Sequence, residues 1–223
     1  KYFILILKLI IIIMQNIDNI RTNYHLDKLD ADSLNPHPML QFKLWFNKIP
    51  QKNDFNAVTL STYNKLEGVR SRIVLLKDFN KTGFIFYTNY NSLKARQIQY
   101  DNHVSLCFFW PDFQRQVRVY GLAEKISVKK SDLYFSKRPR KSQIAAWASE
   151  QSKEIDNRSE LINKYRIIEK KYINKKIPRP DFWGGFNIKP ISIEFWQGGV
   201  DRMHDRFLYC KQNNKWIINR LSP

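Results

Sequence analysis

Hydrophobic positions change their period near residue 56, and this change predicts where helical structure gives way to strands. Over residues 36–50, Phe42, Trp45, Phe46 and Ile49 recur at i, i+3, i+4 and i+7. This stripe predicts an amphipathic helix. From about residue 56 the period is two, which predicts strands.

Beyond residue 70, short apolar runs alternate with turn-forming residues. Residues 72–77 enclose the apolar run Ile73 to Leu76, and with turn formers at 78–83 and a second apolar run at 84–88 they predict a hairpin. The other expected elements are a helix at 92–100, strands at 103–110 and 116–125, helical residues 129–149 broken at Arg138-Pro139, a helix at 158–172 capped by Asn157, a strand at 191–196, and a closing hairpin of 207–211 with 215–220.

Strands in antiparallel succession with helices between them predict an α+β fold built on a small barrel. Residues 36–223 show no repeat and no linker, so we expect a single domain. Tyr2 to Ile13 is apolar apart from Lys8, which is too short a run to span a bilayer. Our hypothesis is that Met14 is the true start, and that residues 1–13 are not native or are disordered.

The net charge of +18 favours anionic partners, such as phosphates, nucleic acid or an anionic membrane face. The lysines are scattered, however, so ordinary surface decoration accounts for the larger share of the charge. The two cysteines, Cys107 and Cys210, do not make a disulfide framework, and the default compartment is a reducing cytoplasm.

Several common kinds of catalytic site are missing from the sequence. The seven glycines form neither a dinucleotide-binding fingerprint nor a phosphate-binding Walker loop. The four histidines are far apart, and no metal-ligand spacing occurs, so we expect no metal. A bound organic cofactor, gripped by side chains, would therefore have to carry any difficult chemical step.

Four small constellations could bind phosphorylated molecules. On a strand, Arg202, His204 and Arg206 would share one face, although an exposed charged face is the simpler interpretation. Tyr134, Arg138 and Ser142 could clamp a phosphate or could belong to an ordinary basic helix. The remaining two are Arg72 with Lys77, and Tyr87-Thr88 with Lys94.

Taken together and in this order, these residues resemble the pyridoxine 5'-phosphate oxidase family from about Arg21 to Pro223. The matching segments are Arg72 to Lys77, Phe86 to Asn89, Arg115 to Val117, Ser136 to Arg140 with Ser142-Gln143, Ala146 to Ser149 with Gln151-Ser152, Phe182 to Phe186, and the terminal Glu194-Phe195-Trp196-Gln197 with Arg202-Met203-His204-Asp205-Arg206.

The resemblance implies a homodimer of FMN-binding split β-barrels, with FMN in a cleft between subunits. The implied FMN contacts are Arg72, Ile73, Val74, Leu75, Lys77, Tyr87, Thr88, Lys94, Gln116, Gln151, Ser152, Trp196 and Arg206. The implied substrate contacts are Lys77, Tyr134, Arg138, Ser142, Arg202 and His204, together with Arg21 and Tyr24 from an N-terminal segment, residues 14–35, that covers the substrate.

The implied activity is oxidation of pyridoxine or pyridoxamine 5'-phosphate by O2 to pyridoxal 5'-phosphate and hydrogen peroxide, with ammonia released from the amine. Arg202 and His204 would be the catalytic residues, and no nucleic acid or membrane would be involved. One departure stands out, because the family usually places arginine before the lysine at 94 and this chain has Leu93. A Gln114 in place of the common glutamate looks minor.

Two other functions are compatible with the sequence. A basic barrel that binds single-stranded nucleic acid would explain the charge and would be colourless. A split-barrel flavoprotein that acts on another substrate would be yellow but inert toward pyridoxine 5'-phosphate.

Overall fold

The computed structural model describes residues 20–52 and 54–223, and the expected start at Met14 lies outside them. The chain forms a nine-stranded antiparallel sheet in the order β2-β1-β5-β6-β7-β4-β3, with β8 and β9 added beside β7. The strands are β1 Ala57–Asn64, β2 Gly68–Leu75, β3 Asp78–Asn80, β4 Gly83–Asn89, β5 His103–Trp110, β6 Arg115–Lys125, β7 Trp183–Gln197, β8 Asp205–Gln212 and β9 Lys215–Leu221.

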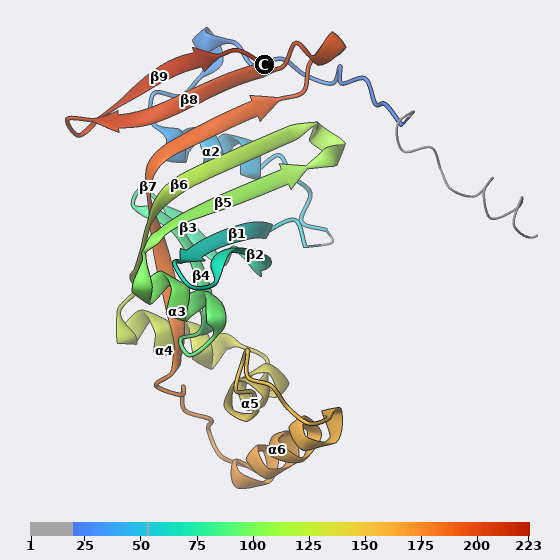
Figure 1. Cartoon of the computed structure of the whole chain (residues 1–223), viewed down its shortest axis with the longest axis vertical. Coiled ribbons are helices and arrows are strands. Elements are labelled where there is room, and N and C mark those ends of the chain that lie inside the picture. Colours follow the sequence, from blue (N-terminus) through green and yellow to red (C-terminus); the bar gives the residue numbers. More distant parts are fainter. Residues whose placement is uncertain (1–19, 53) are drawn as a thin grey trace, which may run out of the picture.

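Five α-helices accompany the sheet in the described part of the chain. Helices α5 and α6 project at one end of the molecule, and β8 and β9 lie at the other (Figure 1). The helices are α2 Pro38–Phe46, α3 Leu93–Tyr100, α4 Val128–Lys137, α5 Arg140–Ala148 and α6 Arg158–Lys171, with single 3-10 turns at η2 Ala31–Ser33, η3 Pro111–Phe113 and η4 Val200–Arg202.

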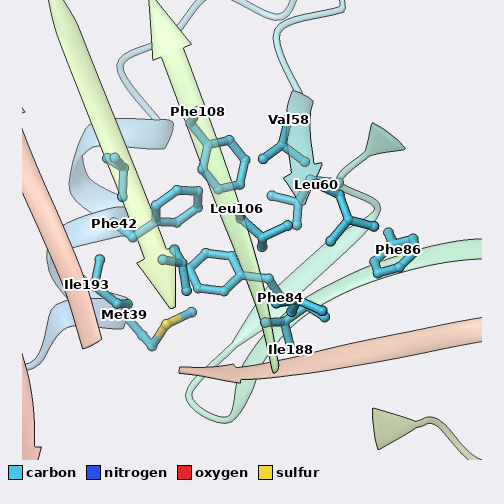
Figure 2. Packing of buried hydrophobic residues seen from close by; sticks show 14 of the residues in the cluster. Met39, Phe42, Val58, Leu60, Phe84, Phe86, Leu106, Phe108, Ile188 and Ile193 are labelled. Carbon is cyan, nitrogen blue, oxygen red and sulfur yellow. The ribbon is translucent and has the colours of Figure 1, made fainter. Parts of the chain in front are cut away.

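The barrel closes around an aromatic core. The Phe42 ring of α2 packs against Phe84 and Phe108, with centroids 4.8 Å and 5.0 Å away (Figure 2). All three side chains are fully buried. Fully burying such a side chain contributes roughly 1.5–3 kcal/mol. The predicted amphipathic helix is therefore confirmed as the element that covers the barrel.

Strand β7 is the central strand of the sheet, because it pairs with β4, β6 and β8 along its 15 residues. The β6–β7 register shifts at Tyr120/Gly121, where the strand pair bends. A Cβ on Gly121 would lie 2.3 Å from the Lys189 carbonyl oxygen, so only glycine fits there. The sequence predicted only residues 191–196 of this strand.

Three expectations need correction. The run at 72–77 does not form a hairpin with 84–88: β2 pairs with β1, and the short β3 forms the hairpin with β4. The closing hairpin is confirmed, with β8 beginning at Asp205, two residues before the predicted start. Arg202 and His204 therefore lie in the turn before the strand and do not share a strand face with Arg206.

Two hydrophobic clusters divide the interior. The larger fills the barrel, and the smaller, centred on Phe135, Ile144, Ile177 and Trp183, joins α4 and α5 to the start of β7. Arg138-Pro139 separates the two helices, as predicted, and the Asn157 side chain accepts the Glu160 N–H at the start of α6. No helix in the described ranges could cross a lipid bilayer.

Candidate functional site

A basic cavity of about 890 Å3 opens between β2, β4 and the α3–α5 helices. This volume is typical of small-molecule sites, which run from roughly 300 to 1,000 Å3. Six cationic side chains line it, and among the described residues no carboxylate does. The cavity contains most of the predicted site: Arg72, Ile73, Val74, Leu75, Lys77, Tyr87, Thr88, Lys94, Tyr134, Arg138, Ser142, Gln151 and Ser152.

Lys94 defines one end of this cavity. Its ammonium donates to Thr88 Oγ1 and Ser92 Oγ, each at 3.3 Å, and the residue is only 8% exposed. Burial, reinforced by the charge of Arg72, lowers the pKa of Lys94 to about 8. A buried ammonium without a counterion is costly, so this end of the cavity is suited to a bound anion.

The loop after α5 closes the same end. Thr88 Oγ1 donates to Gln151 Oε1 at 3.4 Å, and Ser152 Oγ accepts the Leu93 N–H at 3.2 Å. Ser152 lies 59 positions beyond Leu93 in the sequence, and its backbone has a left-handed φ of 72°. Gln151 and Ser152 therefore lie at the Lys94 end of the cavity.

Aromatic rings form the opposite wall. Tyr87 stacks on Tyr134 with centroids 3.8 Å apart, and Trp183 lies parallel to Tyr87 at 5.5 Å. Burial, with a further contribution from Tyr134, raises the pKa of Tyr87 to about 12. The phenol therefore stays protonated at neutral pH and remains available as a hydrogen-bond donor.

Arg138 covers this wall, with its guanidinium carbon 4.6 Å from the Trp183 ring centroid. Its Nη1 is buried and has no hydrogen-bond partner within the described residues. Burial also lowers the pKa of Arg138. An unsatisfied buried donor costs about 1–3 kcal/mol, which an anionic ligand would recover.

The other predicted residues form a second cluster at the far end of the sheet. Gln116, Trp196 and Arg206 are direct cross-strand neighbours on β6, β7 and β8. Trp196 is thirteen residues from Trp183 along β7, a separation of up to roughly 40 Å at the usual strand rise. One chain therefore does not bring Gln116, Trp196 and Arg206 to the basic cavity.

Glu194 holds Arg206 in place within this second cluster. The Arg206 Nε donates to Glu194 Oε1 at 2.9 Å, and Arg118 donates to Glu194 Oε2 at 3.2 Å. Glu194 is 7% exposed, so it serves as a buried carboxylate between two guanidiniums. The sequence indicated Arg206 but not its orienting partner.

His204 and Tyr24 complete the second cluster beside Trp196. The His204 and Trp196 ring centroids are 4.7 Å apart, and Tyr24 meets both rings at less than 6 Å. Tyr24 fits because Gly198 has no side chain: a Cβ there would lie 2.7 Å from the tyrosine. Tyr24 and His204, with Arg21 and Arg202, line a second cavity of about 520 Å3.

The turn before β8 selects the tautomer of the neutral His204 ring. Its Nδ1 accepts the Gly199 N–H at 3.1 Å, which leaves Nε2 to carry the proton in the neutral ring. Burial, followed by the charges of Arg202 and Arg206, lowers the pKa of His204. Asp201 and Arg202 have left-handed φ angles of 53° and 63° in this turn. Such strain concentrates at functional sites.

The N-terminal segment reaches the second cluster through long-range contacts that the sequence did not reveal. Gln114 Oε1 accepts the N–H groups of His25 and Leu26 at 2.9 and 3.2 Å. The buried Arg115 donates to Asp27 at 2.5 Å. Because an amide oxygen can accept both of these bonds, glutamine at 114 still anchors the segment.

The basic cavity also contains residues that sequence reasoning missed. Arg70 and Lys137 line it, as do Pro139 and Trp183. Arg70 escaped notice because the strand was predicted to begin at 72, whereas β2 begins at Gly68. Alternation from Arg72 back to Arg70 was the signal that could have found it.

The fold and the basic cavity define an antiparallel split β-barrel of the FMN-binding class. The chain resembles PhzG from Burkholderia lata 383 with a TM-score of 0.83 at 24% identity, over 89% of this chain and 99% of that structure. It also resembles a pyridoxamine 5'-phosphate oxidase-related, FMN-binding protein from Nostoc punctiforme, with a TM-score of 0.66 at 16% identity. This second match covers 86% of this chain and 100% of that structure. At these identities the likeness shows the fold alone.

The chain belongs to the pyridoxine/pyridoxamine 5'-phosphate oxidase family of oxidoreductases. Residues 50–169 match the family described as pyridoxamine 5'-phosphate oxidase, and 183–223 match the pyridoxine 5'-phosphate oxidase C-terminal dimerisation region. It is 47% identical to pyridoxine/pyridoxamine 5'-phosphate oxidase of Teredinibacter turnerae over 93% of this chain and 100% of that one. Its identity to the enzyme of the same name from Gloeothece citriformis is 44%, over 94% and 99%.

Proposed function

We propose that the protein binds FMN and uses O2 to oxidise pyridoxine 5'-phosphate or pyridoxamine 5'-phosphate to pyridoxal 5'-phosphate. Hydrogen peroxide is the second product, and the amine also consumes water and releases ammonia. The observation that carries this proposal is the basic cavity, with its six cations, its buried Lys94 and the unsatisfied Arg138. FMN and the substrate each bring a phosphate of nearly two negative charges.

The residues of the cavity fit two phosphorylated aromatic molecules. Arg72, Lys94 and the hydroxyls of Thr88 and Ser152 would hold the FMN phosphate at one end. Lys77, Tyr134, Arg138 and Ser142 would hold the substrate phosphate, because they bring two cations and two hydroxyl donors to one wall. When bound, FMN supplies the hydride acceptor and the route for electrons to O2.

We further propose that two copies form the complete site. The second cluster lies too far along β7 to serve its own chain's cavity, and it belongs to the region that matches a family dimerisation region. Exposed apolar side chains accompany both halves: Ile73 on β2 is 63% exposed, and Phe109, the cross-strand neighbour of Gln116, is 52% exposed. Such surfaces are typical of protein interfaces.

In this arrangement, Arg202 and His204 from one copy would complete the cavity of the other. The neutral His204 carries its proton on Nε2 and would act as a hydrogen-bond donor to the substrate, not as a general base. Arg202 would position the substrate by charge and by stacking on its ring. The Tyr24 side chain, docked on Trp196, would help to exclude water.

The direct test is to purify the protein, record its flavin absorbance, and assay pyridoxal 5'-phosphate and peroxide formation from each substrate under air. We expect a yellow protein that is active on at least one of the two. A yellow protein inert toward both would indicate a split-barrel flavoprotein with another substrate. A colourless protein with steeply salt-dependent binding to single-stranded nucleic acid would overturn the proposal.

A further inference from the structure

The Lys94 end of the basic cavity lacks one cation at the start of α3. The first residue of this helix is Leu93, whose aliphatic side chain lines the cavity while its N–H is donated to Ser152 Oγ at 3.2 Å. In the related family this position usually carries arginine, as noted above. A phosphate seated here would therefore lack one charge-assisted donor unless another residue provides it.

Arg70 is placed to provide it. Arg70 and Arg72 alternate along β2, with Arg70 paired to Thr62 and Arg72 paired to Leu60. Side chains two residues apart on a strand share one face, so Arg70 lies on the face of Arg72. Both side chains line the basic cavity together with Leu93 and Lys94.

Contacts between α3 and β2 bring Arg70 to the Leu93 side of the cavity. Gln97 lies one helical turn after Leu93, on the same face of α3. Its amide nitrogen donates to the Gly68 carbonyl oxygen at 3.4 Å, and its oxygen accepts from Thr62 Oγ1 at 2.6 Å. Thr62 is the cross-strand partner of Arg70. The middle of α3, one turn after Leu93, is therefore in contact with the start of β2.

The two arginines differ in what their guanidiniums already bind. Arg72 Nη1 donates to Leu60 O at 3.2 Å and to Thr62 Oγ1 at 2.6 Å, so part of its donor set is committed to the protein. Arg70 is exposed, and its guanidinium makes no hydrogen bond or ion pair with any described residue. Its planar fork is thus available for a bidentate contact with a phosphate.

We propose that Arg70 supplies from β2 the phosphate-binding cation that Leu93 does not supply from α3. The ligand group is the phosphate monoester of FMN, so the inference rests on the proposed function. It predicts that this chain holds the flavin phosphate with Arg70, Arg72 and Lys94, two of them on alternate positions of one strand.

The test compares FMN with riboflavin, which lacks the phosphate, by quenching of flavin fluorescence on the protein stripped of flavin. Arg70→Ala should weaken FMN binding about tenfold, the loss of one charge-assisted contact, and leave riboflavin binding unchanged. Arg166→Ala, on the exposed part of α6, is the matched control and should change neither. Arg70→Lys should give an FMN affinity between those of the unaltered protein and of Arg70→Ala, since lysine keeps the charge but not the planar guanidinium.

A second arm restores the missing cation at the helix. Leu93→Arg in the Arg70→Ala background should recover most of the lost FMN affinity, whereas Leu93→Arg alone should gain much less. Equal gains in both backgrounds would overturn the inference, because Arg70 and position 93 would then act independently. Equal weakening of FMN and riboflavin by Arg70→Ala would also overturn it, since the effect would not concern the phosphate.

These outcomes separate the inference from the proposed function. If the unaltered protein prefers FMN over riboflavin and Arg70→Ala keeps that preference in full, only the role of Arg70 fails. If the unaltered protein shows no preference for the phosphorylated flavin, the cavity does not bind the FMN phosphate, and both the proposed function and the role of Arg70 are wrong.

Discussion

The basic cavity and the second cluster contain similar residue types but are built by different means. The cavity gathers its cations from β2, the link between β2 and β3, α3 and the end of α4, and within the described residues neither the buried Lys94 nor the half-buried Arg138 has a carboxylate partner. In the second cluster, neighbouring carboxylates already pair with Arg206 and Arg115. The cavity is therefore poised to bind anions, whereas the second cluster is held rigid to orient a few side chains.

Mutations in the two regions should therefore affect different properties of the protein. Changes in the cavity should act on the binding of phosphorylated molecules. Changes at Arg202 and His204, in the turn before β8, should act on turnover with little effect on flavin affinity. Flavin binding and turnover are thus divided between the cavity and this turn.

The largest effect is expected from the turn before β8. Arg202→Ala and His204→Ala should each lower kcat/KM about 100-fold, because the substrate loses its positioning contacts. Bound flavin per subunit should stay near that of the unaltered protein. Steady-state kinetics with a flavin absorbance ratio would measure both, and loss of flavin with normal turnover per remaining flavin would contradict the division.

Lys94→Met should have the opposite effect, on flavin binding and not on turnover. Removing the buried ammonium while keeping its aliphatic stem should weaken FMN binding about 10- to 100-fold, since hydrogen bonds to charged groups are worth about 1.5–3 kcal/mol. Turnover per bound flavin should change little. Fluorescence titration of the flavin-free protein gives the affinity. An unchanged affinity would show that Lys94 does not bind the FMN phosphate.

Lys77→Ala should affect the substrate more than the flavin. The side chain lines the cavity without a partner among the described residues, so its loss should raise KM about tenfold while kcat stays within a factor of a few. Initial rates over a range of pyridoxine 5'-phosphate concentrations would show this split. A fall in kcat with unchanged KM would place Lys77 in the chemical step instead.

The smallest effect is a pH dependence of FMN binding. Lys94 must be protonated to bind the phosphate, and its pKa in the free protein is about 8. The affinity should therefore be highest below pH 8 and fall above it, by at most about tenfold per pH unit for one proton. Riboflavin should show no such slope, and a slope that persists in Lys94→Met would assign it to another group.

The sequence predicted the local elements well and the distant contacts poorly. The helix carrying Phe42, the break at Arg138-Pro139 and the closing hairpin depend on neighbouring residues and are all present. The pairing of β2 with β1, the full length of β7 and the contact of Arg115 with Asp27 depend on residues brought together only by folding. Periodicity contains no information on such partners.

For the site, residue types were predictable and their arrangement was not. Arg72, Lys94 and Arg138, which the resemblance named as binding residues, line one cavity. The resemblance did not indicate that Arg206 lies at the opposite end of the sheet, or that Arg70 lines the same cavity as Leu93. His204 was placed on a strand because alternation was assumed to extend through 202–206, whereas two left-handed residues make a turn there.

The central claim, that each site combines the cavity of one copy with the second cluster of another, can be tested with mixed dimers. One subunit would carry Arg72→Ala and Lys94→Met, the other Arg202→Ala and His204→Ala, with different affinity tags to isolate the heterodimer. Each altered homodimer should be nearly inactive. The heterodimer should regain about half the activity of the unaltered dimer, because one of its two symmetric sites contains no altered residue. A heterodimer as inactive as its parents would contradict the claim.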